Sequence, residues 1–165
     1  MKSQFKLWSV YLALCGCLVL SGCSNNRQTT APNPPIQTSK LVAQQQQLLV
    51  QIQQEWQGTP YKLGGTNKQG VDCSAFVQHA YDRLYNSLLP RTTEQQLALG
   101  ISVSLAEAQT GDLIFFRTSH KVRHVGVIYD QDYFLHASTS QGVIFSRLDN
   151  PYWSARILLI KRPFI

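Results

Sequence analysis

The C-terminal third of the chain constrains the fold most, because there the apolar residues change from helical spacing to short runs. Beyond Gly111 five such runs follow one another, separated by short polar segments. Short runs rich in β-branched and aromatic residues are typical of strands. They are residues 113–116, 124–129, 133–138, 142–147 and 156–161. Strands joined by tight turns pair antiparallel, so the sequence predicts an antiparallel sheet.

Helical patterns precede these runs. Apolar residues at near-helical spacing predict a helix over 41–57, and a second apolar stripe predicts one over 73–85 with Asp72 as its N-cap. Thr93 and Gln96 fit a capping box for a short third helix. Helices first and an antiparallel sheet afterwards indicate an α+β domain with the helices packed on the sheet.

The N-terminus has the pattern of an export signal over residues 1–22. Two lysines come first, and residues 7–20 are apolar, uncharged and too short to span a bilayer comfortably. The signal ends in Leu-Ser-Gly-Cys at 20–23, which resembles a bacterial lipobox with Cys23 as the lipidated residue. An ordinary signal peptide with an incidental cysteine is the alternative.

The segment after the lipobox predicts a tether. Residues 24–40 are rich in Asn, Gln, Thr and Pro, with Ile36 as their one large apolar residue, so they cannot build a core. We therefore expect a lipidated tether over 23–40 and one folded domain over 41–165. Ser24, rather than Asp, follows the lipidated cysteine, which predicts an outer-membrane lipoprotein that faces the periplasm.

The cysteine count directs attention to Cys73. Cys15 and Cys17 would leave with the signal and Cys23 would carry lipid, so Cys73 would remain as a lone thiol. In an oxidising compartment a lone thiol indicates nucleophilic catalysis, and a buried inert cysteine is the alternative. Its place at a predicted helix start led us to expect a lowered thiol pKa.

Charge argues against a nucleic-acid partner. Removing two lysines with the signal leaves 13 of the 15 basic residues against 9 acidic ones, a net charge of +4. No run of Lys or Arg is interleaved with aromatic residues. This mild charge is compatible with weak attraction to an anionic cell-wall polymer.

Two histidines fall on neighbouring predicted strands. A hairpin centred on Asp130 would place His124 directly opposite His136, and a shift of two residues would leave them diagonal. Such a pair can form a relay in which His136 orients His124 and His124 takes the proton of Cys73. Two unrelated strand histidines, or a zinc site of two His and one Cys, are the alternatives. The sequence offers no Cys-x-x-Cys or His-x-x-x-His to support zinc.

Several motifs together resemble the NlpC-type branch of papain-like cysteine peptidases, which cleave bacterial cell-wall peptides. The resemblance covers residues 56–165 and is strongest to lipoprotein members. Its motifs are GTPYKLGG at 58–65, GVDCS at 70–74, LPRT at 89–92, TGDL at 110–113, RHVG at 123–126, HASTS at 136–140 and NPYW at 150–153. Ala75 departs from the glycine that the family usually has there.

The resemblance implies a papain-like fold with the catalytic cysteine at a helix N-terminus. It implies Cys73 as nucleophile, His124 as general base and acid, and His136 as the orienting third residue. It also implies that Tyr61 helps to stabilise the oxyanion, with the backbone N–H of Cys73 as a second donor. It implies no cofactor and no metal.

The resemblance also implies a substrate, the stem peptides of peptidoglycan. Asp72 and Ser74 are candidates to bind the peptide, although a role in the helix cap suits each equally, and Arg123 is a candidate to contact a substrate carboxylate. We expect cleavage of D-alanyl-diaminopimelate cross-links, with the D-γ-glutamyl-diaminopimelate bond as the alternative. A non-catalytic lipoprotein that binds the cell wall is the alternative from another class.

Overall fold

The structure is a computed structural model that describes residues 36–120 and 123–164. Three predicted features lie wholly or mostly outside the described residues: the signal peptide, the lipidation site Cys23 and the tether. The described residues belong to one compact unit, 34–165. In the described ranges no helix has both the length and the apolar character needed to cross a membrane.

The first helix, α1, spans Ile36–Trp56 and buries Leu49, Ile52 and Trp56. It begins five residues before the predicted start at residue 41. Residues 36–40 hold no Pro or Gly, so nothing in them prevents the helix from continuing toward its N-terminus. The part of the predicted tether that is described is therefore helical.

The second helix, α2, spans Cys73–Tyr85, as the sequence predicts. Its N-cap is Asp72, whose carboxylate accepts the backbone N–H of Ala75 at 2.8 Å. Asn86 ends the helix in the left-handed conformation. The apolar stripe of α2 is buried, so this helix anchors the N-terminal half of the domain to the sheet.

The short helix α3 spans Thr93–Leu97, and its capping box lies one residue before the predicted one. Thr92 accepts the backbone N–H of Gln95 at 3.3 Å, and the Gln95 side chain reaches back to Thr92. Gln96 is fully buried instead, and its amide donates to two main-chain carbonyls. The sequence pattern fits Thr92 with Gln95 as well as Thr93 with Gln96. Because the Gln96 side chain is buried and bonded elsewhere, the capping box forms between Thr92 and Gln95.

A six-stranded antiparallel sheet follows, in the order β3-β8-β4-β5-β6-β7, which confirms the α+β prediction. Its strands are β3 Ile101–Val103, β4 Leu113–Arg117, β5 Arg123–Ile128, β6 Tyr133–Ser138, β7 Gly142–Arg147 and β8 Ile157–Arg162. The sequence did not predict the shorter elements, which are β1 Thr66–Asn67, β2 Gly70–Val71, the edge strand β3, the 3-10 helix η1 Leu105–Glu107 and helix α4 Pro151–Ser154.

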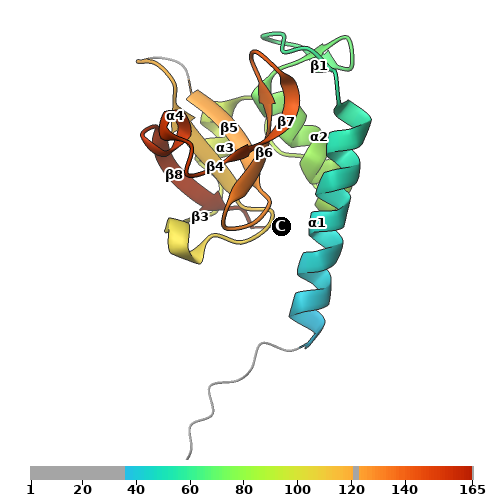
Figure 1. The fold of residues 1–165 in the computed structure, drawn as a ribbon, viewed down its shortest axis with the longest axis vertical. Helices are drawn as coiled ribbons and strands as arrows, with labels where there is room; N and C mark the ends of the chain where they lie inside the picture. The colour runs from blue at the N-terminus through green and yellow to red at the C-terminus, as the bar shows by residue number, and fades with distance from the viewer. Residues whose placement is uncertain (1–35, 121–122, 165) are drawn as a thin grey trace, which may run out of the picture. The chain divides into compact units, whose positions relative to one another are not determined.

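The two faces of the sheet carry separate cores. Helices α1 and α2 lie side by side against one face (Figure 1), and apolar residues of β4, β5 and β6 pack beneath them. The other face carries a smaller, strongly aromatic cluster that includes Phe116 and Phe134, with Trp153 of α4 packed against it. The alternation of strand side chains assigns even-numbered residues of β5 and β6 to this second face.

The β5–β6 hairpin corrects the predicted register. Val127 pairs with Leu135, so the hairpin is centred on Gln131 rather than on Asp130. The Asp130 carboxylate accepts the backbone N–H groups of residues 132 and 133, each at 2.8 Å. This side-chain acceptor stabilises a turn one residue further along, which the strand pattern alone does not reveal.

Candidate active site

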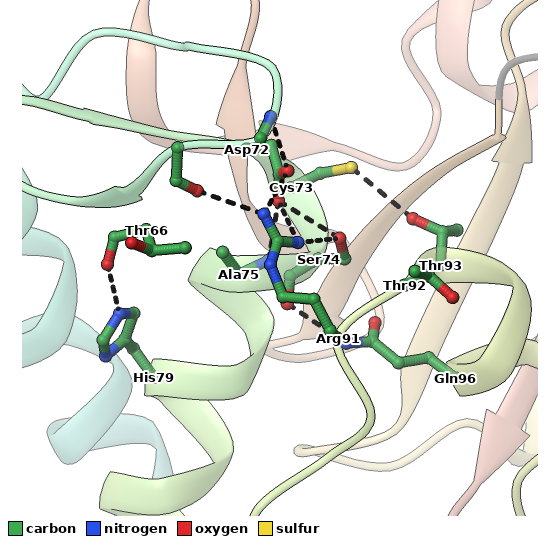
Figure 2. A network of polar contacts seen from close by, with 12 residues as sticks. Thr66, Asp72, Cys73, Ser74, Ala75, His79, Arg91, Thr92, Thr93 and Gln96 are labelled. Atoms are coloured by element: carbon green, nitrogen blue, oxygen red, sulfur yellow. Dashed lines mark hydrogen bonds and ion pairs between the residues drawn. The ribbon is translucent and has the colours of Figure 1, made fainter.

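Cys73 is a free, buried thiol at the first residue of α2, with 5% of its surface exposed. Its sulfur points away from the helix toward Thr93, whose hydroxyl oxygen lies 3.8 Å away (Figure 2). The backbone N–H groups of Ser74 and Val125 also donate to the sulfur. Because Val125 follows His124 on β5, this contact brings the thiol to the strand that carries the first histidine.

The ionisation of Cys73 differs from the sequence expectation. Burial raises the pKa of the thiol, and the hydrogen bonds from Val125, Thr93 and Ser74 offset only part of this effect. The expected lowering at a helix start is therefore wrong, because the loss of hydration exceeds the stabilisation from the hydrogen-bond donors. The thiol rests protonated and needs a base to release its proton.

His124 and His136 form a hydrogen-bonded pair. Nε2 of His124 lies 2.8 Å from Nδ1 of His136, and the two rings are perpendicular. The hairpin register leaves them diagonal, as the alternative register implied, rather than directly opposite. Both rings are buried, with 6% and 0% of their surfaces exposed.

The sheet opens beside this pair. Pairing of β4 with β5 continues to Arg117↔Arg123, whereas pairing of β5 with β6 ends at Val127↔Leu135. Gly126 faces β6 at this point, and a Cβ there would lie 2.7 Å from the Phe134 ring and 3.2 Å from Cβ of His136. The missing side chain at 126 lets the strand carrying His136 come this near.

Aromatic rings enclose the two imidazoles. Trp153 stacks on His124 with ring centroids 5.3 Å apart, and Phe134 stacks on His136 at 4.7 Å. Burial lowers the pKa of His124 to about 4, and burial together with His124 lowers the pKa of His136 well below its ordinary value. Both rings are therefore neutral at pH 7. No role was predicted for Trp153, although it belongs to the NPYW motif at 150–153.

Ser146 on β7 is a second residue that the sequence did not indicate. Its hydroxyl oxygen lies 2.9 Å from Nε2 of His136. In the β6–β7 ladder Ser146 pairs with Phe134, so it reaches His136 diagonally. A serine in a strand gives no sequence signal of such a contact.

Tyr61 lies beside the thiol, as the resemblance implied. Backbone hydrogen bonds from Lys62 to Val71 and from Val71 to Pro60 hold its segment next to the residues that precede α2. The Tyr61 hydroxyl is within hydrogen-bonding reach of Cys73. Burial, followed by the nearby Cys73, raises the pKa of Tyr61 to about 12, so the phenol stays protonated as a donor.

Asp72 and Ser74 are buried and form a polar network with the partly exposed Arg91 (Figure 2). Arg91 donates to both carboxylate oxygens of Asp72, at 3.0 and 2.7 Å, and to the Ser74 hydroxyl at 3.0 Å. Burial opposes ionisation of Asp72, but these bonds and backbone donors outweigh it and lower its pKa. The geometry fits the helix-cap alternative for both residues. No role was predicted for Arg91, which lies in the LPRT motif at 89–92.

Arg123 is at the surface beside the histidine strand. Its guanidinium lies 3.8 Å from Glu94 of α3, and both side chains are exposed, at 40% and 84%. Such a pair is weak. Arg123 is therefore accessible to a ligand.

A pocket of about 400 Å³ adjoins His124 where the strands separate. Among the residues that the structure describes, none of those lining it is Lys, Arg, Asp or Glu. The lining residues are Tyr61, Thr118, His124, Ser138, Thr139, Ser140, Gln141, Ile144, Ser146, Asn150, Tyr152 and Trp153. Hydroxyl and amide groups suit an uncharged, hydrogen-bonding stretch of ligand such as a peptide backbone.

The zinc alternative can be compared with the side chains that the structure describes. In the ranges 36–120 and 123–164, no group of three or more His, Cys, Asp or Glu side chains is placed to hold an ion. Both ring nitrogens of His136 are engaged by protein partners. His136 therefore has no ring nitrogen left without a protein partner.

Residues 58–162 match the NlpC/P60 family. A probable endopeptidase of Haemophilus influenzae is 47% identical over 117 residues, which cover 70% of this chain and 73% of the relative. The murein DD-endopeptidase MepS/murein LD-carboxypeptidase of Escherichia coli K12 is 37% identical over 161 residues, which cover 87% and 86% of the two chains.

Solved structures of NlpC/P60 domains have the same fold as this chain. A lipoprotein-like member of the NLP/P60 family from Staphylococcus aureus superposes with a TM-score of 0.65 at 29% identity, over 74% of this chain and 42% of that one. This chain thus spans less than half the length of that protein. The family match and these relatives define the chain as a cysteine peptidase. The chain belongs to the NlpC/P60 family.

Proposed function

We propose that this protein is a peptidoglycan hydrolase that cleaves stem-peptide amide bonds by a Cys73–His124–His136 mechanism. The observation that carries the proposal is the pair of neutral imidazoles 2.8 Å apart, of which His124 lies on β5, the strand whose Val125 N–H contacts the sulfur of Cys73. The murein endopeptidase named among the relatives supports the substrate class.

In the first half of the reaction, the Cys73 sulfur attacks the carbonyl carbon of the scissile amide while its proton passes to Nδ1 of His124. Because thiol and imidazole are both neutral at rest, proton transfer accompanies the attack. His136 stabilises the imidazolium that forms. His124 then gives the proton to the leaving nitrogen, the C–N bond breaks, and a thioester remains on Cys73.

In the second half, His124 removes a proton from water, and the resulting attack on the thioester releases the carboxylic acid and restores the thiol. The Tyr61 hydroxyl and the backbone N–H of Cys73 stabilise the oxyanion in both halves. Because His124 protonates the leaving amine, the pocket beside His124 accommodates the amine side of the scissile bond. Arg123 contacts a carboxylate of the substrate at the surface.

The bond cleaved is the D-alanyl-diaminopimelate cross-link. The Escherichia coli relative, named a DD-endopeptidase, supports this assignment. Mass analysis of products from a purified cross-linked muropeptide dimer tests it. Two monomers with intact stem peptides are expected, whereas products cut after D-glutamate would assign the enzyme to the D-γ-glutamyl-diaminopimelate bond.

Cys73→Ala and Cys73→Ser in the full chain, purified in detergent, test the mechanism. Both variants should unfold near the wild-type urea midpoint, because each replaces one small buried side chain. Neither should release products from the dimer. Retained hydrolysis by Cys73→Ala would exclude the thiol as nucleophile, and a wild-type chain that binds sacculi without hydrolysing them would establish the non-catalytic alternative.

We also propose that lipid on Cys23 anchors the protein to the outer membrane, with the domain in the periplasm. The support is the Leu-Ser-Gly-Cys sequence at 20–23 followed by Ser24. Cys23→Ala should release the protein from the membrane fraction, and Ser24→Asp should move it to the inner membrane. An unchanged distribution in both variants would contradict the anchor.

A further inference from the structure

His136 is held at both ends of its ring. Nδ1 lies 2.8 Å from His124 and Nε2 lies 2.9 Å from the Ser146 hydroxyl oxygen. The three residues come from β5, β6 and β7, three neighbouring strands of the sheet. They form a continuous hydrogen-bonded row from Ser146 on β7 through His136 on β6 to His124 on β5.

The tautomers of this row follow from the role of His124, and this step rests on the proposed function. To take the Cys73 proton, neutral His124 must keep Nδ1 free of hydrogen and therefore carry its proton on Nε2. That N–H donates to Nδ1 of His136, which must then be bare. His136 consequently carries its own proton on Nε2 and needs an acceptor there, which the Ser146 oxygen supplies.

We propose that Ser146 is a positioning residue: its hydroxyl oxygen accepts the Nε2–H of His136 and so supports the tautomer that keeps Nδ1 of His124 available as the base. In the opposite tautomer, His136 donates from Nδ1 to Nε2 of His124, and the proton of His124 then occupies the nitrogen that should receive the one from Cys73. The His136 ring is fully buried, so bulk water does not replace a lost acceptor freely.

The surroundings of Ser146 agree with this role. Its side chain is half-buried and lines the pocket beside His124. Since the oxygen accepts from His136, the hydroxyl proton of Ser146 can be donated to a group in the pocket without breaking the bond to His136. Substrate in the pocket can therefore strengthen the row of hydrogen bonds rather than compete with it.

The inference is tested by measuring kcat and KM for hydrolysis of the cross-linked muropeptide dimer by the full chain in detergent. Ser146→Ala should lower kcat about tenfold, the cost of one lost buried hydrogen bond, with KM within about twofold of wild type. Ser146→Thr keeps the hydroxyl in a strand-compatible side chain and should restore most of kcat. Phe145→Leu is the matched control, because it perturbs β7 on the face that packs against Tyr129 and leaves the relay untouched.

A second measurement reports the tautomer itself. In the ¹⁵N spectrum of histidine-labelled protein at pH 7, His136 should show a protonated Nε2 and a bare Nδ1. Ser146→Ala should move this signal toward the other tautomer, and Phe145→Leu should not. A merely structural serine would leave the tautomer unchanged.

The outcomes separate this inference from the proposed function. Wild-type kcat in Ser146→Ala, an equal loss in Phe145→Leu, or an unshifted His136 signal would each overturn the role of Ser146, while an inactive Cys73→Ala would still support the peptidase mechanism. Activity in Cys73→Ala would instead overturn the mechanism itself.

Discussion

The two walls of the site are built by opposite means. The nucleophile wall consists of Asp72, Ser74 and Arg91 around the start of α2, and fixed charges hold it together. The base wall consists of His124 and His136 against Trp153, and it contains ionisable groups that burial keeps neutral. In the nucleophile wall, opposite charges on Arg91 and Asp72 are paired. In the base wall, burial keeps His124 and His136 uncharged.

Because of this difference, mutations in one wall should change mainly the stability of the protein, and mutations in the other should change mainly its turnover. A paired charge in a helix cap contributes to the native state whether or not substrate is bound. A neutral buried imidazole costs little at pH 7 and becomes charged only when it accepts a proton during the reaction. The nucleophile wall should therefore be sensitive mainly to unfolding measurements, and the base wall to kinetic ones.

The largest effect should come from the base wall. His136→Ala removes the group that orients His124 and stabilises its imidazolium, so kcat should fall about a hundredfold, with a much smaller change in KM. Turnover of the cross-linked dimer measures this. His79→Ala, at an exposed histidine that contacts the Thr66 carbonyl, is the control and should keep wild-type kcat. Unchanged turnover in His136→Ala would reject the relay.

The nucleophile wall should show the next largest effect, on stability. Asp72→Ala removes the helix cap and leaves Arg91 without its carboxylate, so the free energy of unfolding should fall by about 3 kcal/mol in urea titrations. Asp72→Asn keeps a cap oxygen and should lose roughly half as much. A hundredfold loss of kcat at unchanged stability would break the distinction between the walls.

A smaller effect concerns the pH dependence of the base. With the pKa of His124 lowered to about 4, the imidazole is unprotonated at pH 5 and kcat/KM should match that at pH 7. Trp153→Ala admits water and moves this pKa up toward 6.5, so protonated His124 should reduce kcat/KM at pH 5 about tenfold relative to pH 7. Trp153→Phe should keep the wild-type profile. A wild-type loss already centred near pH 6.5 would contradict a neutral, buried base.

The smallest effect should be at Arg123. The exposed pair with Glu94 contributes little to stability, so Arg123→Gln should leave the urea midpoint unchanged. Loss of a surface contact to a substrate carboxylate should raise KM about threefold with kcat unchanged. Glu94→Gln, which frees Arg123, should not raise KM. An unaltered KM in Arg123→Gln would remove that residue from the substrate site.

What the sequence could predict depended on local pattern. The bounds of α2 and its cap Asp72 follow from helix periodicity and capping chemistry, and the placing of His124 near His136 follows from strand alternation. The register itself was missed, because the Asp130 carboxylate stabilises a different turn. The thiol pKa and the contact to Ser146 were beyond reach, since both depend on which distant segments come together in the fold.

Gly126 has no functional group, yet the distance between the imidazoles depends on it. A methyl group there would act as a wedge between β5 and β6, against the Phe134 ring and Cβ of His136. Hydrogen bonds between nitrogen atoms weaken once they stretch by a few tenths of an ångström beyond their optimum. The proton path to Cys73 can thus be interrupted by widening the sheet at a residue that never meets the substrate.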